Sequence, residues 1–216
     1  MAVAVLQLAA AWLVAVGLAT SAQAQLRIEI APAVGGYFPT RPLPQAGTLL
    51  FSGDEVLPPH ALQQERAGAL GGRVAVWFNR RSAVEGSFWY APSKVTDDPA
   101  YVSPGAGAVT MAGLRYVFRV DPDLPVLSLL LMAGPAIVHR SGDAWAGITG
   151  TTSPALGLGI GIDALPASRV GLRGEVSDYL YNVNLSGDSD AGSWSYSDSS
   201  AFQHDLIISL ALSLRP

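Results

Sequence analysis

The chain contains no cysteine, and only 14% of its 216 residues are charged. The lack of cysteine excludes disulfide bonds and thiolate metal sites. The charged fraction is about half of what a soluble domain carries, and the mean hydropathy is +0.32, so the composition is typical of a membrane protein. A net charge of only -4 disfavours nucleic acid as a partner.

Long hydrophobic runs are also missing after the first 24 residues. The longest apolar run, Val126–Val138, is interrupted by Ser128, Gly134 and Pro135. It is shorter than the roughly 20 residues that a membrane-spanning helix requires. Strands are the remaining way to cross lipid, because every backbone polar group there must be paired within the protein.

The first 24 residues have the pattern of an export signal. Ala2–Ala19 is apolar, and Ala22-Gln23-Ala24 supplies the small residues that signal peptidase requires. We therefore expect a signal peptide over residues 1–24, cleaved before Gln25, and a single domain over residues 25–216. No Lys or Arg precedes the apolar run, which leaves an uncleaved N-terminal anchor as the alternative.

The rest of the chain alternates between apolar side chains and small or charged ones. In Val170–Ser177, the side chains of Val170, Leu172 and Val176 share one face, and Arg173 and Glu175 share the other. The predicted strands are Leu26–Phe38, Leu70–Phe78, Ser82–Tyr90, Val109–Val120, Val126–His139, Leu156–Asp163, Val170–Ser177 and Leu206–Arg215. Both faces of Leu127–Met132 are apolar, so its orientation cannot be read from the sequence.

The less apolar face of these strands decides between two architectures. A soluble β-sandwich would put its apolar face in a core of large side chains and its polar face in water. Here Leu156, Leu158 and Ile160 oppose Gly157 and Gly159. Small residues opposite large aliphatic ones fit the narrow inside of an eight-stranded barrel whose apolar face contacts lipid.

The connections between the strands alternate between short and long. The expected turns are Asn79–Arg81, Asp121–Pro125 and Pro166–Ser168, and the expected loops are Thr40–Arg66, Pro92–Pro104, Ser141–Ser153 and Ser186–Ser200. Outer-membrane barrels have short periplasmic turns and longer extracellular loops. The sequence therefore predicts an all-β fold, an eight-stranded antiparallel up-and-down transmembrane β-barrel with both chain termini in the periplasm.

Aromatic side chains gather at membrane interfaces, and the strand ends supply candidates for two such belts. The candidates at the extracellular rim are Tyr37, Phe38, Phe88, Tyr90, Tyr179, Tyr181 and Phe202, and those at the periplasmic rim are Trp77, Phe78, Tyr116 and Phe118.

The face opposite the aliphatic residues carries charges that we expect to line the lumen. These are Arg27, Glu29, Arg73, Glu85, Arg115, Arg119, Arg173 and Glu175. Buried opposite charges must pair, because isolated ones would cost several kcal/mol each in desolvation. We expect a salt-bridged, plugged lumen with Glu85 or Glu175 paired to Arg115 or Arg173 at its centre. A narrow ion path lined by these charges is the alternative.

The strand count, the alternating connections and the opening stretch Pro32–Pro39 resemble the small eight-stranded outer-membrane β-barrels, the OmpA-like and OmpX-like barrel domains. The resemblance covers about Gln25–Pro216 and implies a monomer in the bacterial outer membrane. It also implies contact with membrane lipids and lipopolysaccharide, a structural or interaction role and possible ligand binding at the extracellular loops. The chain departs from the family by ending Leu214-Arg215-Pro216, without a final aromatic residue, and no periplasmic domain is expected after the barrel.

Two other function classes stay open. Some barrels of this size are lipid A hydrolases that use a His-x-Ser pair, and His139 and Ser141 have this spacing, which places both on one face of a strand. They are weak catalytic candidates, and we expect no enzyme. The other class is an exported soluble carrier of lipocalin type, which would reverse the two faces.

Metals and cofactors have little support in the sequence. Three scattered histidines without cysteine do not form a transition-metal site, and no cofactor is expected. Asp188, Asp190 and Asp198 lie among Gly and Ser in the fourth loop and could bind calcium at the cell surface, although acidic loops are usually just solvated. Trp145, Trp194 and Tyr196 are the candidate contact residues of the extracellular loops.

Overall fold

The computed structural model describes residues 26–43, 61–98, 105–120, 126–188 and 195–215. Its strands are β1 (Arg27–Pro39), β2 (Ala61–Gln64), β3 (Ala67–Trp77), β4 (Ser82–Asp98), β5 (Gly105–Val120), β6 (Leu127–Ser141), β7 (Ile148–Thr149), β8 (Thr152–Ala164), β9 (Val170–Asp188) and β10 (Ser195–Leu214). A short 3-10 helix, η1, spans Asp143–Trp145. None of the described helices is long and apolar enough to cross a membrane.

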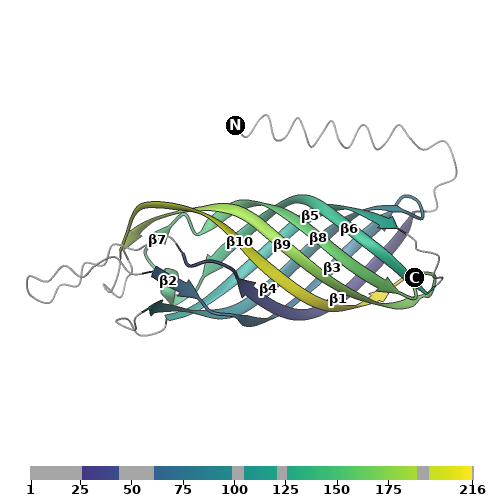
Figure 1. Ribbon diagram of the computed structural model, residues 1–216, viewed down its shortest axis with the longest axis horizontal. Helices are drawn as coiled ribbons and strands as arrows, with labels where there is room; N and C mark the ends of the chain where they lie inside the picture. Colours follow the sequence, from purple (N-terminus) through teal and green to yellow (C-terminus); the bar gives the residue numbers. More distant parts are fainter. Residues whose placement is uncertain (1–25, 44–60, 99–104, 121–125, 189–194, 216) are drawn as a thin grey trace, which may run out of the picture.

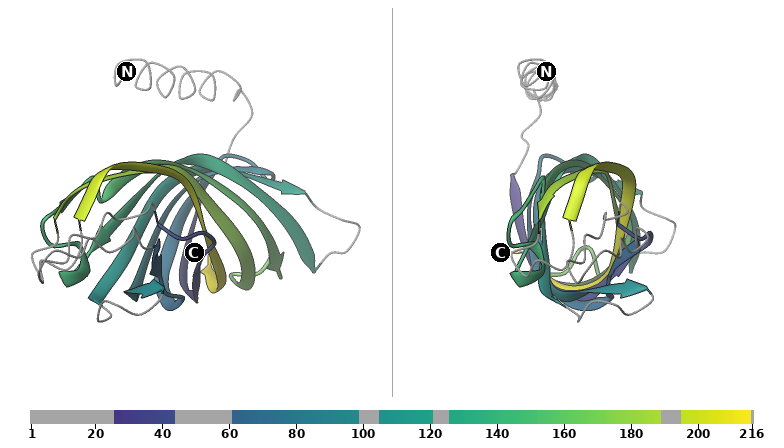
Figure 2. Two further views of the ribbon diagram at one scale, coloured as in Figure 1. Left: turned by 60° about the vertical axis from the view of Figure 1, so that its left-hand side comes forward. Right: turned by 90° about the vertical axis from the view of Figure 1, so that its left-hand side faces the viewer.

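The eight long strands close into a barrel. Their order is β10-β1-β3-β4-β5-β6-β8-β9, and β10 pairs with β9 as well as with β1. Every pairing is antiparallel, and each long strand pairs with the next one in the chain. Figure 2 shows the resulting ring in its right-hand view. The predicted all-β, eight-stranded antiparallel barrel is confirmed.

The two ends of the barrel differ. One end, here called the turn end, carries the connections after β3, β5 and β8, together with the start of β1 and the end of β10. The other, here called the loop end, carries the connections after β1, β4, β6 and β9, and it includes β2, η1 and β7. Figure 1 places the turn end at the right and the loop end at the left.

Apolar side chains cover the outside of the barrel. In β9, Leu172 and Val176 are 50% and 40% exposed, whereas Arg173, Glu175 and Ser177 are at most 3% exposed. The same alternation runs through β10, where Ile208 and Leu210 face outward. A soluble carrier would have the apolar side chains inside and the polar ones outside, which is the reverse of this arrangement. The observed arrangement suits a barrel surrounded by lipid.

Several strands continue beyond their predicted ends at the loop end. β4 extends to Asp98, β9 extends to Asp188, and β10 begins at Ser195. The expected loops were therefore too long, and β2 lies within the first of them, paired with β4. Polar residues continue these strands because strand pairing depends on backbone groups, which need no apolar side chains.

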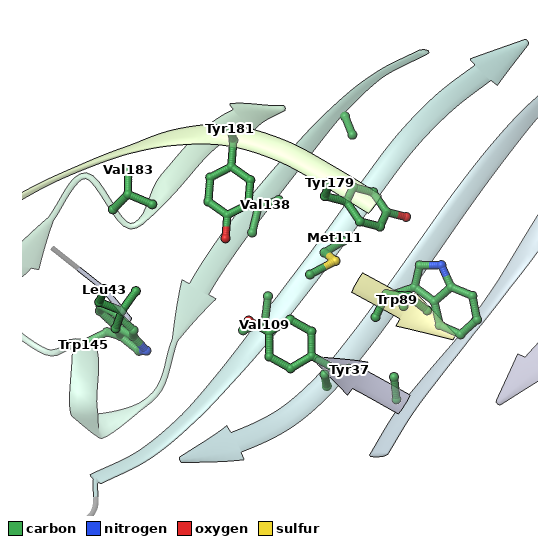
Figure 3. Close-up of a cluster of buried hydrophobic side chains, with 14 of the residues drawn as sticks. Tyr37, Leu43, Trp89, Val109, Met111, Val138, Trp145, Tyr179, Tyr181 and Val183 are labelled. Carbon is green, nitrogen blue, oxygen red and sulfur yellow. The ribbon is translucent and has the colours of Figure 1, made fainter. Parts of the chain in front are cut away.

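The interior is not polar throughout, in contrast to the expectation of small and charged residues. A cluster of buried apolar and aromatic side chains fills the half of the lumen near the loop end, and Figure 3 shows ten of them with labels. They are Tyr37, Leu43, Trp89, Val109, Met111, Val138, Trp145, Tyr179, Tyr181 and Val183. A smaller apolar cluster, which includes Trp77, Leu130 and Met132, lies nearer the turn end.

The prediction of two aromatic belts is partly wrong. Phe88, Tyr90, Tyr116, Phe118 and Phe202 face outward with exposures of 39% to 51%, and Phe38 and Phe78 are half-buried. Tyr37, Trp77, Tyr179 and Tyr181 are buried inside the barrel instead. Tyr37 has the same strand parity as Glu29, and Tyr179 the same as Glu175, so parity places them in the lumen although they lie toward strand ends.

Candidate functional site

The lumen holds three groups of polar side chains, here called the middle, turn-end and loop-end tiers. The middle tier contains Arg73 on β3, Glu85 on β4, Arg115 on β5, and Arg173 and Glu175 on β9. All five are at most 3% exposed. Such ions are stable in a dry lumen only when they are paired and hydrogen-bonded.

Two carboxylates and three guanidinium groups form the middle tier. Glu85 accepts from Arg115 at 2.5 Å and from Arg173 at 2.6 Å. Glu175 accepts from Arg115 at 2.8 Å and from Arg173 at 2.6 Å, and Arg73 Nε lies 3.2 Å from it. Every expected pairing of these two acids with Arg115 and Arg173 is therefore present, and the buried salt-bridge network in the lumen is confirmed.

These ion pairs cross the barrel. β4 and β9 lie four strands apart in a ring of eight, so the Glu85–Arg173 pair joins opposite walls. Arg115 on β5 reaches Glu175 on β9 and donates to Ser177 Oγ at 2.8 Å. The middle tier therefore occupies the centre of the lumen and does not merely line one wall.

The turn-end tier lies in the lumen near the start of β1 and the end of β10. Arg215 contacts Glu29 at 2.8 Å and Asp163 at 2.6 Å, and Arg119 lies 3.1 Å from Asp163. The guanidinium of Arg119 stacks 4.0 Å from the centre of the Trp77 ring. Arg215 therefore connects the end of β10 to β1 and to β8.

The loop-end tier surrounds Asp205 on β10. Tyr37 donates to Asp205 Oδ2 at 2.9 Å, Tyr181 donates to the same oxygen, and Arg140 donates to Tyr181. Arg140 Nε also donates to Gln64 Oε1 at 3.3 Å. This tier ties β2 to the barrel wall, because Gln64 lies on β2.

Trp145 covers the loop-end tier from η1. It is 4% exposed, and the Arg140 guanidinium lies 5.7 Å from its ring. The prediction that Trp145 is an exposed contact residue is wrong, because its side chain fills the apolar cluster (Figure 3). Trp194 lies outside the described residues, as does the side chain of Tyr196.

Seven of the eight expected lumen charges point inward, and Arg27 does not. Arg27 is exposed at the turn end, in the first position of β1, so its placement in the lumen is wrong. There a long side chain reaches water beyond the barrel rim. The side chains of Asp188, Asp190 and Asp198 lie outside those that the structure describes.

Sequence reasoning missed five members of the tiers: Gln64, Arg140, Asp163, Asp205 and Arg215. Asp163 and Arg215 had the inward parity of their strands, which was the available signal. Arg140 lies at the end of β6, where an apolar stretch had hidden the parity.

His139 and Ser141 share a face of β6, but the structure does not assemble a catalytic group around them. His139 is exposed, and its Nδ1 lies 2.8 Å from Thr152 Oγ1. Within the described residues, neither a hydrogen bond between His139 and Ser141 nor a carboxylate bonded to His139 is found. A hydrolytic site needs both contacts.

Comparisons with solved structures support the same fold. The outer membrane protein AlkL, solved in lipid bilayers, superposes with a TM-score of 0.59 at 15% identity over 92% of this chain and 94% of its own. The outer membrane protein OprG from Pseudomonas aeruginosa gives 0.54 at 11% identity over 87% of this chain and 96% of its own. The chain has the fold of the eight-stranded outer-membrane β-barrels. No protein-family model and no curated protein matches the sequence.

The two ends of this molecule correspond to the two ends of eight-stranded outer-membrane β-barrels. In such barrels short turns face the periplasm and longer loops face outward. A chain inserted in the same way would have the turn-end tier on the periplasmic side, and the apolar cluster with the loop-end tier toward the outside.

Proposed function

We propose that this protein is an integral protein of the bacterial outer membrane with a structural or interaction role and a closed lumen. Its apolar outer wall would contact membrane lipid, and its extracellular connections would present residues to the cell exterior. Trp194 and Tyr196 remain the candidate contact residues there. The signal peptide proposed for residues 1–24 would direct export, and we propose a monomer because the barrel closes within one chain.

The pairing across the lumen is the observation that carries this proposal. Ion pairs between β4 and β9 join opposite walls, so an ion moving through the barrel would have to separate Glu85 from Arg173. The apolar cluster lies on one side of the middle tier, and the turn-end tier lies on the other. An eight-stranded barrel has just enough inner width for side chains.

Conductance in planar lipid bilayers tests the closed lumen. We expect the mature protein to show no steady conductance above that of the bare bilayer. A Glu85→Ala/Arg115→Ala/Arg173→Ala variant should show measurable conductance, because it removes the crossing side chains together and leaves Glu175 paired with Arg73. An Arg80→Gln/Arg81→Gln variant, altered at an exposed periplasmic turn, should remain closed.

Steady conductance by the unaltered protein would contradict the proposal and favour the narrow ion path. Heat-dependent migration on a gel should be recorded for each variant. It shows whether a variant without conductance is a folded barrel or protein that failed to insert.

A further inference from the structure

The exposed cations at the extracellular end form a row over one side of the barrel. Arg41 follows β1, Arg66 precedes β3, and Lys94 lies near the outer end of β4. β1, β3 and β4 are consecutive in the ring, so at about 4.8 Å per strand these cations span roughly 10 to 15 Å. All three are exposed, in contrast to the paired arginines of the lumen.

Aromatic rings hold two of these cations on the outer wall. The Arg41 guanidinium lies 5.8 Å from the Phe202 ring, and the Arg66 guanidinium lies 5.9 Å from the Phe38 ring. Phe202 is 48% exposed and faces outward from β10. Cation–π contacts of this length hold a guanidinium beside the ring, so both charges stay at the membrane surface.

Among the side chains that the structure describes, no carboxylate lies within ion-pair distance of Arg41, Arg66 or Lys94. A row of guanidinium and ammonium groups above an apolar wall complements a lipid with phosphate groups on its headgroup.

A groove of about 960 Å³ lies on the same side of the outer wall, deeper in the membrane. Its lining includes Pro32, Gly72, Gly86, Val74, Phe88 and Leu114 from β1, β3, β4 and β5. A Cβ atom built on Gly86 would meet no atom within 4 Å, so the groove is open at this point. Small residues between Val74, Phe88 and Leu114 leave a shallow apolar groove along which an acyl chain can lie.

The distance between the cation row and the groove matches the distance between the headgroup of a lipid and its acyl chains. Gly72 follows Arg66 by six residues, and Phe88 precedes Lys94 by six. Six strand residues span roughly 20 Å, and a strand tilt of about 45° reduces this to roughly 14 Å of depth. That depth is about half of the roughly 30 Å hydrocarbon core, the length of one leaflet.

We propose that β1, β3 and β4 form a binding site for a phosphorylated glycolipid of the outer leaflet, with its phosphates at Arg41, Arg66 and Lys94 and an acyl chain in the groove over Gly72 and Gly86. This site rests on the proposed outer-membrane location and assigns the lipid contact to particular residues.

Native mass spectrometry of the detergent-folded mature protein tests the site, with bisphosphorylated lipid A as the probe. Arg41→Gln/Arg66→Gln/Lys94→Gln should weaken binding by roughly a hundredfold, because three cations at about 1 kcal/mol each contribute about 3 kcal/mol to binding an anionic headgroup. The matched variant Arg80→Gln/Arg81→Gln/Arg169→Gln removes three exposed cations at the periplasmic end and should bind within about twofold of the unaltered protein.

A second pair of variants tests whether the groove holds an acyl chain. Gly86→Leu should fill it and weaken binding, whereas Gly174→Leu should not. Gly174 also has no atom within 4 Å of a built Cβ, but it lies on β9, opposite β4 in the ring and away from the groove.

Two further measurements distinguish binding of the lipid from binding of free phosphate. Dephosphorylated lipid A should bind more weakly than the bisphosphorylated form, and inorganic phosphate at the same concentration should not displace it. Undiminished binding by the Arg41/Arg66/Lys94 variant, an equal loss in the periplasmic control, or displacement by inorganic phosphate would overturn the site. Heat-dependent gel migration and bilayer conductance of these variants report on the barrel itself, so failure of the lipid site is distinguishable from failure of the proposed function.

Discussion

Individual charges inside this barrel depend on each other more than charges on a soluble surface do. Arg173 illustrates this, because it contacts both Glu85 and Glu175 at 2.6 Å with no exposure to solvent. Removing one partner from such a group leaves the other charges buried without compensation. The middle tier should therefore tolerate paired removal of charges better than single removal.

Arg173→Met should lower the free energy of unfolding by about 3 to 5 kcal/mol, because Glu85 and Glu175 would lose a shared cation inside the lumen. Urea unfolding in lipid vesicles measures the change. Arg80→Gln, at an exposed turn, should change it by less than about 0.5 kcal/mol. Equal stability of Arg173→Met and the unaltered protein would mean that the middle tier does not stabilise the barrel.

The face on which a single residue lies could be predicted from the sequence, but its depth in the lumen could not. Strand parity predicts that Arg173 lies in the lumen, and opposite charge predicts its pairing with Glu85 or Glu175; the structure shows both contacts. Tyr181 was assigned to the rim because it is aromatic, although its contact with Asp205 lies inside. Strand parity decides the face, whereas the depth of a residue depends on strand tilt and register, which the sequence does not reveal.

At the scale of the elements, β5 and β6 approach closely at Gly134. The pairing between the two strands is recorded for Gly113 with Ala136 and for Tyr116 with Ala133, with a gap between them. A Cβ on Gly134 would overlap the Leu114 carbonyl oxygen and lie 2.7 Å from Arg115 Cα. A glycine is required here because both obstacles are backbone atoms that cannot rotate away.

Gly134→Ala should destabilise the barrel by about 1 to 3 kcal/mol, because the two strands must separate to admit the methyl group. The urea midpoint of folding in vesicles is the measurement. Gly174→Ala is the matched control, since its built Cβ meets no atom within 4 Å, and it should have a small effect. If the two variants are equally stable, the close approach of β5 and β6 is not a constraint on the fold.

Eight strands and their alternating connections could be predicted at this scale, whereas several strand boundaries could not. The parity of Leu127–Met132 was unreadable because Leu130 and Met132 face an apolar cluster inside while Leu131 faces outward at 43% exposure. Where the inner side chains are apolar as well, the sequence does not alternate between polar and apolar residues. The extensions of β4 and β9 were missed because backbone pairing continues there without an apolar face.

At the scale of the whole molecule, the three tiers connect strands that are distant in the sequence. Arg215 joins the last strand to Glu29 on the first, 186 residues away. Tyr37 on β1 bonds Asp205 on β10 across 168 residues. The seam between the first and last strands is therefore supported from inside the lumen at both ends, in addition to the β1–β10 backbone pairing.

Single-cysteine scanning along β10 tests the placement of the two faces most directly, and the absence of native cysteine makes it free of background. Spin labels at Leu206, Ile208, Leu210 and Leu212 in vesicles should be accessible to oxygen dissolved in lipid. Labels at Ile207, Ser209, Ala211 and Ser213 should be shielded from both lipid-dissolved oxygen and a water-soluble relaxation agent, because the lumen is packed. The opposite alternation, with the leucine positions shielded and the serine positions open to water, would contradict a barrel that has lipid outside and charges within.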